Sequence, residues 1–258
     1  MIACCKVLGN STCFAFVIVK AYYRKSAGES SILLPFLWLL YVGLEPFVRR
    51  RWPGWIISWS RLLAGDFRDP LVGRDILFGA AIGAALMLIL IVSRISPRLL
   101  GESPEFFLSP GSVRVGNLFF ARFAGQVTAG LFEGFIMVFL LLLFVVVLRR
   151  ERIAVMVLWL LLTVMLALVT EATWLMIPFT ALLAFVVVLT LIRFGLLALV
   201  SAVFFFQILV FYPITTELTA WYAIDFTIAL VIALVLAVYG FYISLGGQKL
   251  LSGKLLEE

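Results

Sequence analysis

The side chains best placed to do chemistry lie in one apolar stretch, residues 117–148, which contains Arg122, Gln126 and Glu133. In a helix, their spacings of four and seven residues place the three side chains on one face. Glu133 then lies about 22 Å from the end of the stretch at Leu148, inside a bilayer core about 30 Å thick. A carboxyl group at that depth must face protein or water. This face is therefore a candidate intramembrane polar site, which serves either transport or a hydrogen bond between helices.

Small residues recur at a helical spacing in two of the apolar stretches. Gly130 and Gly134 form one G-x-x-x-G pattern beside the carboxyl group, and Gly79 and Gly83 form another. Small residues at this spacing let two helix backbones approach closely. For Gly79 and Gly83 the pattern predicts packing inside the bundle, and the alternative is a contact between two copies of the chain.

The composition places these stretches in a membrane. Of the 258 residues, 64% are hydrophobic and 13% are charged, whereas soluble domains average about 45–50% and about 25%. Lipid must therefore cover much of the apolar surface. The formal net charge of +6 is typical of the Lys and Arg excess in cytoplasmic loops. Nothing in the sequence looks like a basic groove interleaved with stacking aromatic residues, so nucleic acid is not expected as a partner.

Several absences narrow the chemistry. The chain has no histidine, which removes the commonest general base and the commonest metal ligand. Its cysteines, Cys4, Cys5 and Cys13, form no C-x-x-C pair and no second cluster, so neither a metal site nor a disulfide framework is expected. We therefore predict a protein that is not an enzyme and has no catalytic residue and no cofactor. Bound phospholipids are expected.

The apolar segments predict an all-α, polytopic integral membrane helix bundle. Seven spans are expected, at residues 32–48, 76–93, 117–148, 153–169, 174–192, 194–211 and 224–245. Residues 1–30 form an N-terminal segment that could supply an eighth span, and residues 31–258 form the transmembrane domain. The basic residues of the connecting segments fall mainly on one side of this arrangement. By the positive-inside rule, this distribution predicts a bacterial inner membrane protein with a cytoplasmic C-terminus.

A basic, tryptophan-rich loop, residues 49–75, separates the first two spans. Its three consecutive arginines are a stop signal expected on the cytoplasmic side. Apolar residues then recur on one helical face, which predicts an amphipathic helix lying at the membrane interface. Asp75 is expected to cap the following helix. The loop residues expected to contact lipid or a protein partner are Arg49, Arg50, Arg51, Trp55, Trp59, Arg61 and Arg68.

The same loop carries a resemblance to a known family. The matching motifs are EPFVRRRWP at residues 45–53, ISWSRLLAG at residues 57–65 and RDPLVGRD at residues 68–75, with a fainter match at residues 239–258. They resemble the C-terminal membrane region of acidobacterial-type multidomain serine/threonine protein kinases. In those proteins a cytoplasmic kinase domain precedes the membrane region. This chain has no glycine-rich phosphate loop, no DFG and no HRD motif, so the resemblance implies no kinase activity.

Three functions remain open. The first is a non-catalytic subunit or anchor of a larger bacterial membrane complex, with membrane lipids and other membrane protein subunits as partners. It would assemble through small-residue helix faces and the basic loop. The alternatives are a transporter or channel using the Arg122–Gln126–Glu133 face, and a membrane sensor or signalling module implied by the kinase resemblance. If the protein is a subunit or anchor, Glu133 needs a fixed partner from another helix, another chain or a bound lipid. Arg122 cannot be that partner, because it lies about 16 Å away along the helix.

Overall fold

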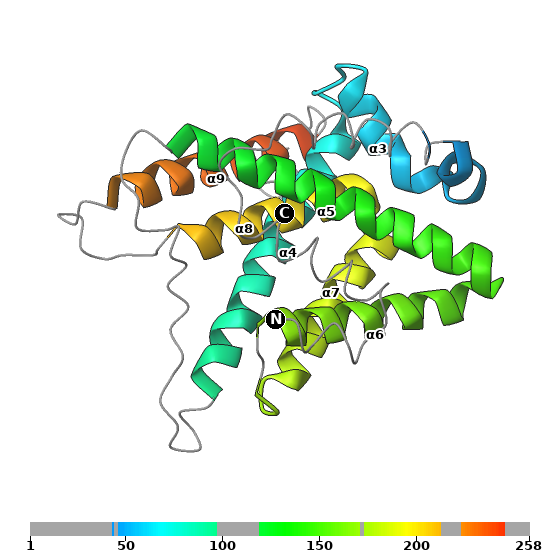
Figure 1. Ribbon diagram of the computed structural model, residues 1–258. Helices are drawn as coiled ribbons and strands as arrows, with labels where there is room; N and C mark the ends of the chain where they lie inside the picture. Colours follow the sequence, from blue (N-terminus) through cyan, green and yellow to red (C-terminus); the bar gives the residue numbers. More distant parts are fainter. Residues whose placement is uncertain (1–42, 44–45, 97–118, 171–172, 213–222, 246–258) are drawn as a thin grey trace, which may run out of the picture.

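The computed structural model describes residues 43, 46–96, 119–170, 173–212 and 223–245, and the regular structure within these ranges is entirely helical (Figure 1). A short helical turn at residues 46–51 comes first. The helices that follow are α3 (Pro53–Leu63), α4 (Pro70–Ile95), α5 (Phe119–Leu148), α6 (Glu151–Val169), α7 (Ile177–Phe194), α8 (Leu196–Phe211) and α9 (Ala223–Ser244). The prediction of an all-α fold is therefore confirmed.

Five of the described helices are long and apolar enough to cross a membrane: Pro70–Ile95, Phe123–Leu148, Glu151–Val169, Ile177–Phe194 and Phe226–Ser244. The chain is thus a multi-pass helical membrane protein, but seven spans are not confirmed. The sixth apolar helix, α8, has 16 residues, or about 24 Å of helix, which is less than the bilayer core. The expected span at residues 32–48 and the candidate eighth span in residues 1–30 lie almost wholly outside the described residues.

α8 is short, and its neighbours enclose it. It packs against α3, α4, α5, α7 and α9. Its buried residues lie on all sides: Leu196, Leu197, Ala198, Leu199, Ala202, Val203, Phe205, Gln207 and Ile208. A helix that is apolar all round is typical of the interior of a large bundle. Since protein covers α8, its length does not have to match the thickness of the lipid.

Small residues bring α4 against α8. A Cβ atom added to Gly79 would meet Ser201 Cβ and lie 3.0 Å from Ala198 O. A Cβ atom added to Gly83 would lie 2.7 Å from Ala202 O. Both glycines therefore face α8 of the same chain, and they meet it in ascending order, so the two helices run in the same direction.

α4 begins earlier than the sequence predicts, at Pro70. Asp69 is its N-cap, because Leu71 N donates a 2.8 Å hydrogen bond to Asp69 Oδ1, and proline is favourable at the first helical position. The prediction that Asp75 caps this helix is wrong. Asp75 is buried in the second turn, where it accepts a 3.1 Å hydrogen bond from Arg74 Nη2.

α3 packs on the bundle through its tryptophan face. Trp59 is buried and meets Phe135 of α5 edge-on, with 5.4 Å between ring centroids. Next to it, Gly195 has a φ of +88°, a conformation that favours glycine, and a Cβ there would lie 2.9 Å from Trp55 O. The expectation that Trp59 contacts lipid or a partner is therefore wrong. An apolar face is satisfied equally well by other helices, and this one is covered by α5 and α8.

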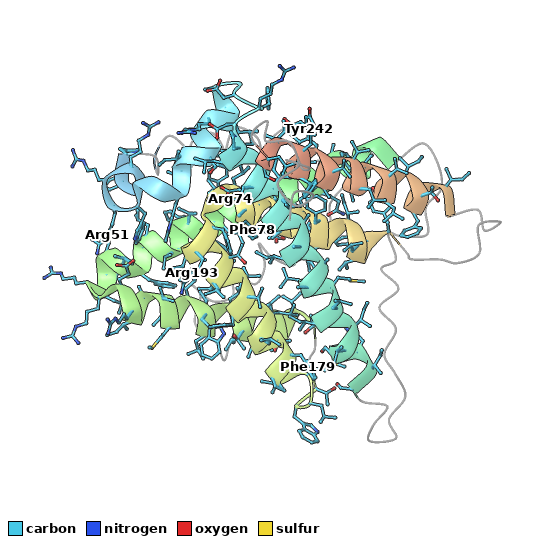
Figure 2. The ribbon with its side chains drawn as sticks, turned by 180° about the vertical axis from the view of Figure 1, so that it is seen from behind. Arg51, Arg74, Phe78, Phe179, Arg193 and Tyr242 are labelled. Carbon is cyan, nitrogen blue, oxygen red and sulfur yellow. The ribbon has the colours of Figure 1, made fainter. Side chains whose placement is uncertain are left out.

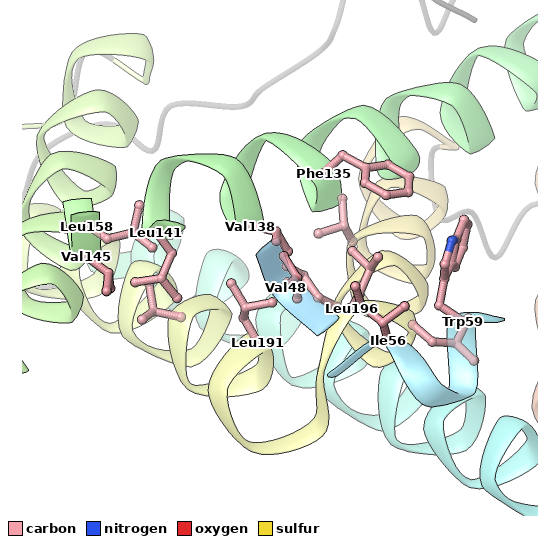
Figure 3. Close-up of a cluster of buried hydrophobic side chains, with 14 of the residues drawn as sticks. Val48, Ile56, Trp59, Phe135, Val138, Leu141, Val145, Leu158, Leu191 and Leu196 are labelled. Atoms are coloured by element: carbon pink, nitrogen blue, oxygen red, sulfur yellow. The ribbon is translucent and has the colours of Figure 1, made fainter. Parts of the chain in front are cut away.

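A buried apolar cluster joins the 46–51 turn to α3, α5, α6, α7 and α8 (Figure 3). Its labelled members are Val48, Ile56, Trp59, Phe135, Val138, Leu141, Val145, Leu158, Leu191 and Leu196. Val48 is completely buried in this cluster, although the residues that follow it are exposed arginines. Burial of an apolar side chain is worth about 1.5–3 kcal/mol, so Val48 fixes the arginine-bearing turn to the bundle.

Candidate functional site

The carboxyl group of Glu133 meets one polar side chain from another helix. Gln207 Nε2 of α8 donates a hydrogen bond to Glu133 Oε1 over 3.2 Å. Gln207 is only 5% exposed, whereas Glu133 is partly exposed. Both residues lie in strongly apolar helices, where a lone polar group needs a partner. The structure thus supplies a partner for Glu133 within the same chain.

Gly130 and Gly134 of α5 both face α8, but only one of them lies in close contact with it. A Cβ atom on Gly134 would lie 2.5 Å from Val200 Cγ2, whereas one on Gly130 would lie 3.5 Å from Val200 O, which is ordinary van der Waals contact. The close approach therefore depends on Gly134. Gly130 faces Phe204 and Gly134 faces Leu196, so α5 and α8 run in opposite directions.

One atom of the pair has no partner. Gln207 Oε1 is buried and has no hydrogen-bond partner among the residues that the structure describes. A buried acceptor left unpaired costs about 1–3 kcal/mol. After rotation of the amide, this oxygen could accept a hydrogen bond from the O–H of a neutral Glu133 carboxyl group, and beside a carboxylate it is a suitable ligand for a hard cation. The arrangement can therefore act as a fixed interhelical hydrogen bond or hold a proton or a small cation.

Of the other two residues of the predicted polar face, only Gln126 has a described side chain, and it is not joined to Glu133. Gln126 is half-buried and lies about 10 Å from Glu133 along α5, too far for a direct hydrogen bond. Arg122 belongs to the first turn of α5, and its side chain lies outside the described residues. The sequence analysis missed Gln207 as the partner. The available signal was that Gln207 is the only amide in the apolar segment 196–211.

The basic residues predicted to contact lipid or a partner fall into two groups. Arg49, Arg50 and Arg51 are exposed on the 46–51 turn, and Arg68 is exposed after α3. Arg61 instead forms an ion pair with Asp69, the N-cap of α4. The ion pair holds the two ends of the short connection between α3 and α4 together.

Trp55 is half-buried, and its ring stacks on that of Trp52 with 4.5 Å between centroids. In the described part of the chain, no group of three or more His, Cys, Asp or Glu side chains could hold a metal ion.

The fold and the Glu133–Gln207 pair define a class of protein: a helical membrane protein with a carboxyl–amide contact between two of its apolar helices. A scan against models of protein families found no match, and searches of curated proteins and of solved structures found no similar chain. The resemblance to kinase membrane regions therefore stays a prediction.

Proposed function

We propose that the protein is a non-catalytic subunit or anchor of a larger complex in a bacterial inner membrane. The observation that carries this proposal is the loop between α3 and α4, whose backbone is fixed. Tyr239 Oη of α9 donates a 2.6 Å hydrogen bond to Phe67 O. Asp66 N donates a 3.0 Å hydrogen bond to Arg61 O, and Arg61 pairs with Asp69.

The last residue of α3 and the fixed loop after it expose large apolar side chains. Leu63 is 56% exposed and Phe67 is 55% exposed, and Arg68 beside them is exposed as well. A surface that is already ordered loses less conformational entropy when a partner binds. By the positive-inside rule the loop is cytoplasmic. We therefore expect a protein partner with an apolar pocket and an acidic rim to bind here.

The Glu133–Gln207 pair has a structural role in this proposal. The pair and Gly134 hold α5 against α8, and α8 in turn packs against α3. Since α3 leads directly into the fixed loop, this packing also holds the start of the loop in place. Such a role requires one lasting arrangement of the hydrogen bond, with no change of partner.

The test compares two loop variants purified from native membranes in mild detergent. The double variant Leu63→Ser, Phe67→Ser should lose a stoichiometric partner that wild type retains. Ile57→Ser, which also removes an exposed apolar side chain from α3, should retain it. Mass spectrometry would identify the co-purifying chains, and thermal unfolding would check that both variants fold. A partner retained by the folded double variant, or absent from wild type, would refute the proposal.

Transport is the second candidate, and the unpartnered Gln207 Oε1 beside Glu133 favours it. Intramembrane carboxyl groups mark proton and ion pathways, and this oxygen could accept a hydrogen bond from the neutral carboxyl group or help to hold a cation beside the carboxylate. Solute or proton flux into liposomes that contain the wild-type protein, abolished by Glu133→Gln, would support a transporter. Equal and negligible flux in wild type and variant would support the subunit.

A further inference from the structure

Two turns that are far apart in the sequence meet at one end of the bundle, and both carry arginines. Trp52 follows the 46–51 turn, and its Nε1 donates a 3.0 Å hydrogen bond to Glu151 Oε1 at the start of α6. Val48 of that turn and Val145 near the end of α5 share the same buried cluster. In Figure 2, Arg51 lies on the same side of the molecule as the tip of the α5–α6 hairpin.

We name this surface the arginine platform and define it by Arg50, Arg51, Arg149, Arg150 and Arg152. All five side chains are exposed. None of the five has an ion-pair partner within the described ranges, and Arg51 lies over the ring of Trp52, with Cζ 5.8 Å from its centroid. The neighbouring acidic group, Glu151, accepts a hydrogen bond from Trp52. That hydrogen bond does not cancel the charge of Glu151, but one carboxylate offsets only part of the charge of five arginines, so the platform keeps a net positive charge that favours an anionic ligand.

The platform lies directly beside the apolar surface that must face lipid. Val147, two residues before Arg149, is 67% exposed, and Met156 on the first turns of α6 is 64% exposed. Apolar side chains this exposed fit among acyl chains, and the arginines that border them then lie among phosphate head groups. The Trp52–Trp55 stack sits at the same border, where tryptophan is enriched in membrane proteins.

Arg149 occupies a strained backbone position directly after α5, which offers a way to test the platform. It is the one residue other than glycine with a positive φ, 55°, in the part of the chain that the structure describes. Glycine adopts this conformation readily, whereas a side chain is strained there. A left-handed residue is common where a helix ends, and it is usually glycine, so Arg149→Gly would remove this charge without disturbing the end of α5.

We propose that the arginine platform binds the head group of an anionic phospholipid that carries two phosphate groups. Guanidinium groups form paired hydrogen bonds with phosphate oxygens, and two phosphates match a surface formed by two turns. The acyl chains would lie along Val147 and Met156. The lipid would cross from the 46–51 turn to the α5–α6 turn and so reinforce the Trp52–Glu151 contact.

The test uses the full-length protein in nanodiscs of zwitterionic phosphatidylcholine, with or without a few per cent of a diphosphate phospholipid. Native mass spectrometry measures bound lipid, and thermal unfolding measures stabilisation. Wild type should retain the diphosphate lipid and gain thermal stability from it. Arg150→Gln, Arg152→Gln should retain at least tenfold less. Arg68→Gln, which removes an exposed arginine elsewhere, should behave as wild type.

Arg149→Gly separates binding from folding, because it removes the charge and relieves the strained backbone. We expect this variant to unfold in pure phosphatidylcholine at the same or a higher temperature than wild type, but to gain less stability from the diphosphate lipid. Wild-type lipid retention in both sets of variants would overturn the proposal. So would equal loss in Arg68→Gln, displacement of the lipid by an equal concentration of inorganic phosphate, or preferential binding of an acidic peptide.

Discussion

The two faces of α8 are packed by different means. Towards α4 the contact is close and involves no side-chain hydrogen bond at the two glycines, since Gly79 and Gly83 lie against backbone atoms of α8. Towards α5 a single tight glycine, Gly134, stands beside a hydrogen bond between Glu133 and Gln207. Lipid tails are as apolar as leucine, so helices in a membrane associate through close packing and hydrogen bonds. α8 uses close packing on one face and adds a polar contact on the other.

This difference indicates on which face of α8 a substitution can be tolerated. Backbone atoms oppose Gly79 and Gly83, so an added side chain can be accommodated only if a whole helix moves. The polar face can lose its hydrogen bond while the helices stay in place, provided that no buried group is left without a partner. The α5–α8 face is therefore the face of α8 that tolerates substitution better.

The largest expected effect comes from Gly83→Leu, which would force α4 and α8 apart. Overfilling a packed interior typically costs about 1–3 kcal/mol, and we expect a loss of about 3 kcal/mol here because the opposing atoms are backbone atoms of α8. Expression level and unfolding in mixed micelles measure the effect. Ala84→Leu, at an exposed position on the same helix, is the matched control and should be nearly neutral. A stable Gly83→Leu variant would contradict the packing described here.

A smaller effect is expected from Glu133→Leu on the polar face. The variant leaves the amide of Gln207 buried without its acceptor, which costs about 1–3 kcal/mol. Adding Gln207→Leu should recover most of that loss, because no polar group is then left unpaired. Glu133→Gln should cost less than about 1 kcal/mol, since the amide oxygen can still accept the hydrogen bond. Unfolding of the single and double variants gives the coupling energy, and a coupling near zero would show that the contact does not form.

The smallest effects separate the two glycines of α5. Gly134→Ala should cost about 1 kcal/mol, because its Cβ must displace the Val200 side chain. Gly130→Ala should instead gain about 0.5–1 kcal/mol, because its Cβ has room and alanine favours the helix. Paired unfolding measurements would show the opposite signs. Equal losses would mean that α5 and α8 approach equally closely at both glycines.

The sequence predicted where the helices lie along the chain better than which helices pack against one another. Hydropathy and glycine spacing indicated the long helices and the residues at which they approach, because both patterns are local along the chain. The partner of Glu133 could not be predicted, since Gln207 lies 74 residues away and spacing within one helix carries no information about the next. For the same reason, the face of α3 that carries Trp59 was expected to meet lipid.

The predicted start of α4 was wrong for a different physical reason. Asp69-Pro70 is a sequence typical of turns, and it is equally typical of an N-cap followed by the first helical residue. Nothing local decides between the two. The Arg61–Asp69 ion pair and the Tyr239–Phe67 hydrogen bond favour the cap, and both depend on tertiary structure.

The single glycine that joins α7 to α8 bears on how the chain enters the bilayer during synthesis. α7 ends at Phe194 and α8 begins at Leu196, so Gly195 alone connects the two apolar helices, and it lies against Trp55. No polar linker allows one helix to leave the translocon and diffuse in lipid before the other is made. We expect the two helices to insert together as a hairpin, with Arg193 retained at the side from which synthesis proceeds.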